Sequence, residues 1–182
     1  VSYNNAGISL NLVPINSLSI SLSANYDENR RNQDQFVRNI TYNNATRTIV
    51  AGVKQKTIRF TGRLSYNLTP DLTIQYYGQP YLTRPTYQQF AYVVNPLADK
   101  YVNRFLKYSS SQISESNGTY LIDENRDGIT DYSFGKPDFN FVQFRSNLVI
   151  RWEYRPGSEL FLVWSEGNTS DNYDDLQTPV FN

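Results

Sequence analysis

One segment of this chain carries oxygen-bearing side chains at the spacing that calcium-binding loops use. Residues 123–131 read Asp-Glu-Asn-Arg-Asp-Gly-Ile-Thr-Asp, with glycine at the sixth position. A chain that wraps around Ca²⁺ needs oxygen ligands at alternate positions, and the glycine permits the sharp turn. The predicted ligands are the side chains of Asp123, Asn125, Asp127 and Asp131 and the main-chain carbonyl of Ile129.

Two interpretations of this loop stay open. The twelfth position is Phe134 rather than the bidentate glutamate of an EF-hand, and no flanking helices are evident, so an EF-hand is excluded. A looser loop that binds Ca²⁺ weakly is one interpretation, with Asp131 binding directly or through water. The other is an Asp/Asn/Gly-rich turn that joins strands at 119–122 and 132–134 without an ion.

A second set of charged residues lies on the polar side of two predicted strands. The set consists of Arg59, Arg63, Arg145, Arg151 and Glu153. If that side lines the lumen of a barrel, these groups set its electrostatics and select solutes. The alternative is a solvated face whose charges only keep water in the interior.

The composition excludes several kinds of chemistry. The chain has 182 residues, and its 17 basic and 17 acidic residues give a net charge of zero, which argues against a nucleic-acid partner. It contains no Cys or His, so disulfides, thiol nucleophiles, His/Cys zinc sites and imidazole triads are excluded. No acid/base or nucleophile constellation is visible, and we expect no enzymatic activity.

The elements that must position these residues alternate between apolar and polar side chains. The alternation is clear at 17–26, 57–68, 72–77 and 142–154, and weaker at 6–12 and 159–165. Successive side chains of a strand point to opposite faces, so each segment predicts a strand with one apolar face. Short proline-containing turns at 13–16, 69–71 and 155–158 join them into hairpins at about 6–26, 57–79 and 141–165.

Strand length and loop asymmetry favour a transmembrane barrel over a soluble sandwich. The segments 57–68 and 142–154 would each extend about 40 Å, which is enough to cross a tilted bilayer. Short turns then alternate with long extracellular loops at about 27–56, 80–140 and 166–182, the asymmetry of outer-membrane barrels. The side chains expected to face lipid are Ile58, Phe60, Leu64, Leu148, Ile150 and Trp152.

Six strands are fewer than the eight of the smallest bacterial outer-membrane barrel. Because an open edge in lipid leaves unpaired N–H and C=O groups, either two strands lie in the long loops or the chain is a segment of a larger barrel. We favour the segment. Within the loop at 80–140, Asn95-Pro96 followed by Leu97, Tyr101 and Phe105 predicts a short amphipathic helix over 95–106.

Three stretches of the chain carry a family resemblance. They are 95–105, 123–141, which ends in Gly-Lys-Pro-Asp-Phe-Asn-Phe, and 144–164, which ends in Trp-Glu-Tyr-Arg-Pro-Gly-Ser-Glu-Leu-Phe-Leu-Val-Trp. They resemble the C-terminal barrel region of large Bacteroidetes-type outer-membrane proteins whose barrel follows a carbohydrate-binding family 9-like domain. The resemblance implies an outer-membrane location and a glycan connection, and it implies no catalytic residue.

The sequence therefore predicts an all-β, antiparallel, transmembrane outer-membrane β-barrel segment, the C-terminal part of a larger barrel. Its expected function is passage or capture of a solute such as an oligosaccharide. The alternatives are a non-transporting barrel that joins a multiprotein outer-membrane complex and, more weakly, a soluble glycan-binding or hydrolytic β-domain. The expected partners are outer-membrane lipid, the rest of its own barrel or another outer-membrane protein, and a glycan.

Overall fold

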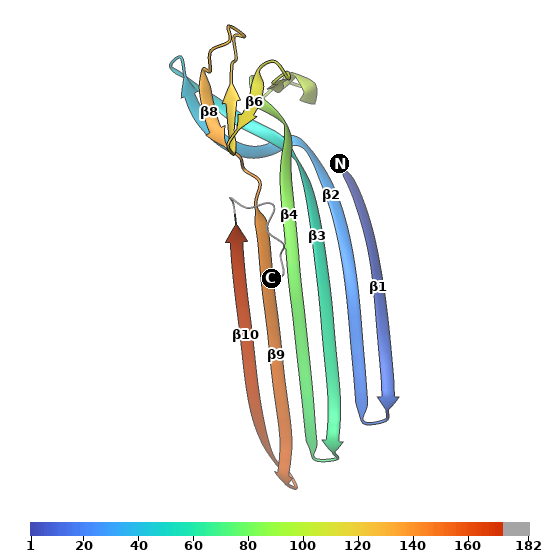
Figure 1. Cartoon of the computed structure of the whole chain (residues 1–182). Coiled ribbons are helices and arrows are strands. Elements are labelled where there is room, and N and C mark those ends of the chain that lie inside the picture. The colour runs from blue at the N-terminus through green and yellow to red at the C-terminus, as the bar shows by residue number, and fades with distance from the viewer. Residues whose placement is uncertain (173–182) are drawn as a thin grey trace.

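The computed structural model describes residues 1–172, and side chains for all of these except 32–34 and 172. The chain is all-β, with antiparallel pairing throughout. Its main sheet is built from six long strands in the order β1-β2-β3-β4-β9-β10 (Figure 1). These strands are β1 Ser2–Ile15, β2 Leu18–Tyr42, β3 Ala45–Thr69, β4 Leu72–Val93, β9 Asn140–Arg155 and β10 Ser158–Asn172.

The three predicted hairpins are confirmed. The strand pairs β1–β2, β3–β4 and β9–β10 are joined by short turns, and all three turns lie at one end of the sheet (Figure 1). In the last of them Gly157 has a φ of +76°, a left-handed conformation that glycine adopts without steric cost.

Within the described residues the main sheet does not close into a barrel, because β1 and β10 remain its two edges. Antiparallel strands are thus established, and closure is not. No helix in this part of the chain has the length and the apolar character needed to cross a membrane.

The strands are longer than predicted, and the segment 27–56, expected to be a loop, is mostly strand. β2 and β3 continue through it and meet at Asn43 and Asn44, whose φ angles are 48° and 58°. Positive φ at both central residues is the geometry of a tight hairpin turn. The predicted loop at 80–140 is likewise shortened, since β4 continues to Val93, and β10 extends into the segment predicted as the last loop. Residues 173–182 of that loop lie outside the described residues.

The helix predicted over 95–106 is wrong. The segment contains only one 3₁₀ turn, η1 at Tyr101–Asn103, and is followed by β5 at Phe105–Lys107. Phe105 pairs with Val93 at the end of β4, so backbone pairing with the main sheet replaces helix formation. Tyr101 and Phe105 are nevertheless in contact, as their i, i+4 spacing predicted, since their ring centroids lie 5.1 Å apart.

A second, small sheet lies at the end of the molecule opposite the short turns (Figure 1). It consists of β6 Ile113–Ser116, β7 Thr119–Ile122 and β8 Tyr132–Gly135, and we call residues 113–135 the lobe. The pairing of β7 with β8 confirms the hairpin predicted around residues 123–131.

The buried core of the protein sits where the lobe meets the main sheet. Ile49 and Ala51 of β3 and Phe90 of β4 pack against Ile122 and Phe134 of the lobe. Ile49, Ala51 and Ile122 have no exposed surface. The long parts of the strands below the lobe have no comparable core, because the sheet there is a single layer and no described element packs on either of its faces.

Candidate functional site

The register of the main sheet brings the predicted lumen residues onto one face. Arg63 of β3 lies opposite Tyr77 of β4, which lies opposite Asn147 of β9. In a parallel row, Arg59 lies opposite Tyr81. We call this side of the sheet the arginine face and the other side the apolar face. The arginine face includes all the residues predicted for the lumen, namely Arg59, Arg63, Arg145, Arg151 and Glu153.

Two of these arginines stack on tyrosines of the neighbouring strand. The guanidinium carbon of Arg63 is 5.5 Å from the centroid of the Tyr77 ring, and that of Arg59 is 5.8 Å from the centroid of Tyr81. Cation–π contacts at these distances hold the guanidinium plane in place. The stacked groups can still offer their planar N–H donors to a carboxylate or phosphate.

A hollow of about 470 Å³ opens beside Arg63. Side chains from five strands line it, including Asn11, Ser21, Gln75, Tyr77 and Asn147. Hydroxyl and amide groups of this kind donate and accept hydrogen bonds, and the aromatic ring adds an apolar surface. Apolar residues, among them Val13 and Val149, line the rest of the hollow. A few polar groups within a largely apolar lining are typical of small-molecule sites.

Arg151 and Glu153 lie on the same face but close to the short turn, where they are already paired. Arg151 is hydrogen-bonded to Glu159 across the β9–β10 hairpin, and its Nη2 lies 3.9 Å from Glu153 Oε2. Glu153 also accepts the N–H of Gly157 at 2.9 Å. These charges neutralise one another locally, so they differ from the arginines further along the sheet.

The loop at 123–131 is closed by its own carboxylates. Asp123 accepts the backbone N–H groups of Arg126, Asp127 and Gly128 at 2.6, 3.1 and 2.8 Å. Asp127 accepts the N–H of Ile129 at 2.8 Å and a hydrogen bond from the Asn125 side-chain amide at 2.9 Å. The loop therefore has a defined turn geometry that these hydrogen bonds alone can hold.

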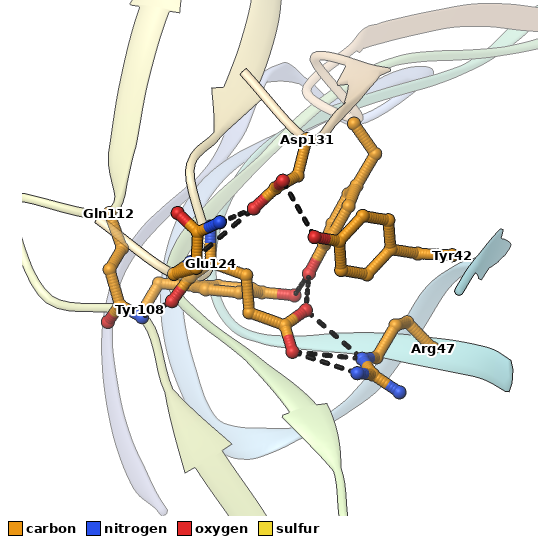
Figure 2. A network of polar contacts seen from close by, with 8 residues as sticks. Tyr42, Arg47, Tyr108, Gln112, Glu124 and Asp131 are labelled. Atoms are coloured by element: carbon orange, nitrogen blue, oxygen red, sulfur yellow. Dashed lines mark hydrogen bonds and ion pairs between the residues drawn. The ribbon is translucent and has the colours of Figure 1, made fainter. Parts of the chain in front are cut away.

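Asp131 has partners that the sequence did not indicate. One of its oxygens accepts the hydroxyl of Tyr42 at 2.7 Å, and the other accepts the backbone N–H of Glu124 at 2.7 Å (Figure 2). The carboxylate thus ties the loop to the tip of the β2–β3 hairpin. Within residues 1–172 no group of His, Cys, Asp or Glu is clustered as a metal site, and binding of Ca²⁺ stays a prediction.

Glu124 is the centre of a second connection between the lobe and that hairpin. Its carboxylate accepts two-pronged hydrogen bonds from Arg47, with Nη2 2.9 Å from Oε1, and accepts the Tyr132 hydroxyl at 2.6 Å (Figure 2). The Tyr132 and Tyr108 hydroxyls are 2.9 Å apart, and the Arg47 guanidinium stacks on the ring of Tyr92 at 5.2 Å. We call Arg47, Tyr92, Tyr108, Glu124 and Tyr132 together the lobe clamp, or the clamp.

The clamp shifts the ionisation of its members. Burial raises the pKa of Glu124, but hydrogen bonds from Arg47 and Tyr132 outweigh it and leave that pKa below its ordinary value. Burial raises the pKa of the Tyr132 hydroxyl, and its bond to Glu124 raises it further. Burial likewise raises the pKa of Tyr108. The clamp therefore consists of a charged Arg47–Glu124 pair and neutral tyrosines.

The lobe packs on the same side of the sheet as the arginines. Ile49 and Ala51 share the odd-numbered side of β3 with Arg59 and Arg63. Between residues 49 and 63 of β3 the register irregularities place the extra residues on β2 and β4, so the alternation of faces along this part of β3 is unbroken. The side chains that contact the lobe thus project from the arginine face. Sequence reasoning missed the clamp because Arg47 and Glu124 are 77 residues apart. Arg47 belongs to no motif, and Glu124 is not among the predicted ligands of the 123–131 loop.

No family model, curated protein or solved structure matches this chain.

Proposed function

We propose that the chain forms part of an outer-membrane β-barrel, with its apolar face against lipid and its arginine face along a path for a solute. The observation that carries the proposal is an unbroken apolar row across all six long strands. The row consists of Leu12, Ile20, Leu64, Tyr76, Leu148 and Trp164, each paired with the next. The neighbouring row continues it through Leu18, Tyr66, Ile74, Ile150 and Leu162.

The apolar face is largely exposed. Ile8 is 74% exposed, Leu162 61% and Trp164 66%, and Leu22 and Phe60 are nearly half exposed. Scattered exposed apolar residues are ordinary, but a contiguous patch of this extent marks an interface with an apolar partner. Lipid matches the pattern well, because the opposite face of the same strands is mostly polar, as in barrels that enclose water, with Val149, Phe161 and Val163 among its apolar exceptions on β9 and β10.

The two unpaired edges of the main sheet mean that a barrel needs further strands. β1 and β10 each present unpaired backbone groups, which cost several kcal/mol apiece in a bilayer. Further strands must therefore pair with them, from the rest of the same polypeptide or from another copy. The six long strands run alternately up and down, each antiparallel to its neighbour. Any number of added antiparallel hairpins therefore keeps this alternation of strand direction around a closed barrel.

The position of the lobe supports passage or capture of a solute. The lobe sits at the loop end of the sheet and packs on the arginine face, so in a closed barrel it would lie over the mouth. A solute would then meet the lobe before it reached the arginines. The resemblance to glycan-associated barrel proteins makes an oligosaccharide our proposed solute class.

One observation favours a second candidate, a barrel that joins a multiprotein outer-membrane complex. Next to the lobe, Leu97 is 89% exposed, Val102 75% and Leu106 50%. An exposed apolar segment at the loop end is suited to contact with another protein. Under this alternative the arginine face would be closed to solutes.

Membrane fractionation tests the shared part of both proposals. The intact protein should co-sediment with outer membranes and stay with them during alkaline carbonate washing, which releases peripheral proteins. Conductance in planar bilayers then separates the two candidates, since only the solute path predicts a water-filled lumen. Recovery of the protein in the soluble fraction, without detergent, would contradict both.

A further inference from the structure

Three arginines on the arginine face have no acidic partner. Within the described part of the chain, Arg59, Arg63 and Arg145 take part in no ion pair. The arginines outside this stretch that form ion pairs do so with glutamates, as Arg47 does with Glu124 and Arg151 with Glu159. Uncompensated positive charge is therefore concentrated on one part of one face.

The three charges occupy successive rows of the sheet. Arg63 shares its row with Tyr77, Arg145 is opposite Gln79 in the next row, and Arg59 shares the third row with Tyr81. Rows on one face are about 6.6 Å apart along the strands, so the outer two arginines are about 13 Å apart. In the described residues these three rows contain no Asp or Glu. Their other members are Gly7, Ser9, Asn11, Ser21, Ser23, Asn25, Thr61, Gln143, Asn147, Ser165, Gly167 and Thr169.

This arrangement matches a particular ligand chemistry. Guanidinium groups bind carboxylate and phosphate oxygens with paired N–H donors. Serine, threonine and amide side chains hydrogen-bond sugar hydroxyls, and the tyrosine rings offer apolar surface to a sugar ring. Within these three rows a cation meets three like charges and no carboxylate, which disfavours its passage. The nearest acidic side chains on this face, Asp27 and Asp171, lie in the next row beyond Arg59.

We propose that the arginine face binds and passes anionic, hydroxyl-rich solutes, of which acidic oligosaccharides are the class that fits best. Arg63, Arg145 and Arg59 form successive contacts for the anionic groups along the path. This inference rests on the proposed solute path and adds its charge selectivity and its contact residues.

The test is the ion selectivity of the intact protein in planar bilayers under a tenfold KCl gradient. The wild-type protein should favour chloride over potassium. Replacing the arginines together, as Arg59→Gln, Arg63→Gln and Arg145→Gln, should lower the ratio of chloride to potassium permeability by about fivefold or more, since each charge acts at short range in a narrow pore. The control Arg151→Gln with Glu159→Gln removes an internally paired couple and should leave the ratio nearly unchanged.

A block experiment identifies the solute class. Trigalacturonate should reduce the wild-type current at concentrations where neutral maltotriose does not, and the triple variant should lose that difference. Block by glucose 6-phosphate but not by trigalacturonate would overturn the acidic-oligosaccharide class. A conducting pore that prefers potassium, or one whose selectivity survives the triple substitution, would overturn this inference while leaving the solute path intact. Absence of conductance from protein that is embedded in the bilayer would refute the solute path itself, and the inference with it.

Discussion

Ile150 and Val149 are adjacent on β9 and lie on opposite faces of the sheet, so they form a matched pair for a charge substitution. Ile150 is paired with Ile74 on one side and Leu162 on the other, both apolar. Val149 is paired with Gln75 and Val163 on the arginine face. Both side chains are half-buried, so the two sites differ mainly in what surrounds them.

Replacing Ile150 with arginine places a guanidinium among apolar neighbours that provide no hydrogen-bond acceptor. On a lipid-facing surface near the bilayer midplane this costs about 2–4 kcal/mol of folding free energy. The ratio of folded to unfolded protein should fall by about 30-fold to about 900-fold. Val149→Arg should change the stability by no more than about 0.5 kcal/mol, because water and polar side chains solvate the new charge.

The assay is urea unfolding of the intact protein in lipid vesicles, followed by tryptophan fluorescence. The chain has two tryptophans, and both Trp152 and Trp164 lie on the apolar face, 49% and 66% exposed. Their emission should shift to longer wavelength when the strands leave the lipid. Equal destabilisation by the two substitutions, or a larger effect of Val149→Arg, would refute the assignment of the faces.

Four further predictions concern the loop end. Removing the clamp by Arg47→Gln should lower the free energy of lobe opening by about 1–3 kcal/mol, because it leaves the Glu124 carboxylate without its main partner. Hydrogen exchange of the β7 and β8 amides measures this change, with Arg155→Gln as the control. The folded-state pKa of Glu124 is lowered, so its contribution to the stability of the lobe is present above its ordinary pKa of about 4.3 and is lost as the pH falls through the lowered value. The amides of β7 and β8 should therefore lose exchange protection in acid, and an acid profile unchanged by Glu124→Gln would count against this. Protease added to intact cells should cut within 107–120 if it cuts at all, whereas cleavage that needs a permeabilised outer membrane would reverse the topology. The 123–131 loop should bind Ca²⁺ weakly, with a dissociation constant of about 10⁻⁴–10⁻³ M, and equal calorimetric heats for the wild type and Asp127→Ala would leave only the plain turn.

The strands below the lobe were predictable because their signal is local. Period-two alternation in β2, β3 and β9 needs only neighbouring residues, and the proline turns mark where each hairpin reverses. The extension of β2 and β3 beyond the predicted hairpins was missed because the alternation breaks there. Between Arg31 and Gln35, β2 carries two residues more than β3, which interrupts the pattern, and between Phe36 and Arg38 it carries one more, which reverses the phase of the pattern.

The candidate site was predictable only in part. The five charged residues predicted for the lumen follow from parity along single strands, but the stacking of Arg59 on Tyr81 and of Arg63 on Tyr77 depends on the register between strands. The helix prediction at 95–106 failed because local spacing cannot show that Phe105 pairs with the end of β4. The clamp joins Arg47 to Glu124 through tertiary contacts that no local pattern encodes.

The most direct test of the membrane assignment uses the absence of cysteine from the chain. Single cysteines at successive positions from 145 to 152, each carrying a nitroxide label, report accessibility to oxygen, which concentrates in lipid, and to a water-soluble nickel chelate. In the intact, membrane-reconstituted protein, labels at 146, 148, 150 and 152 should be accessible to oxygen, and labels at 145, 147, 149 and 151 to nickel. A profile without this alternation, or one in which the even-numbered labels are inaccessible to both reagents, would contradict the account, because it would place the apolar face against protein rather than lipid.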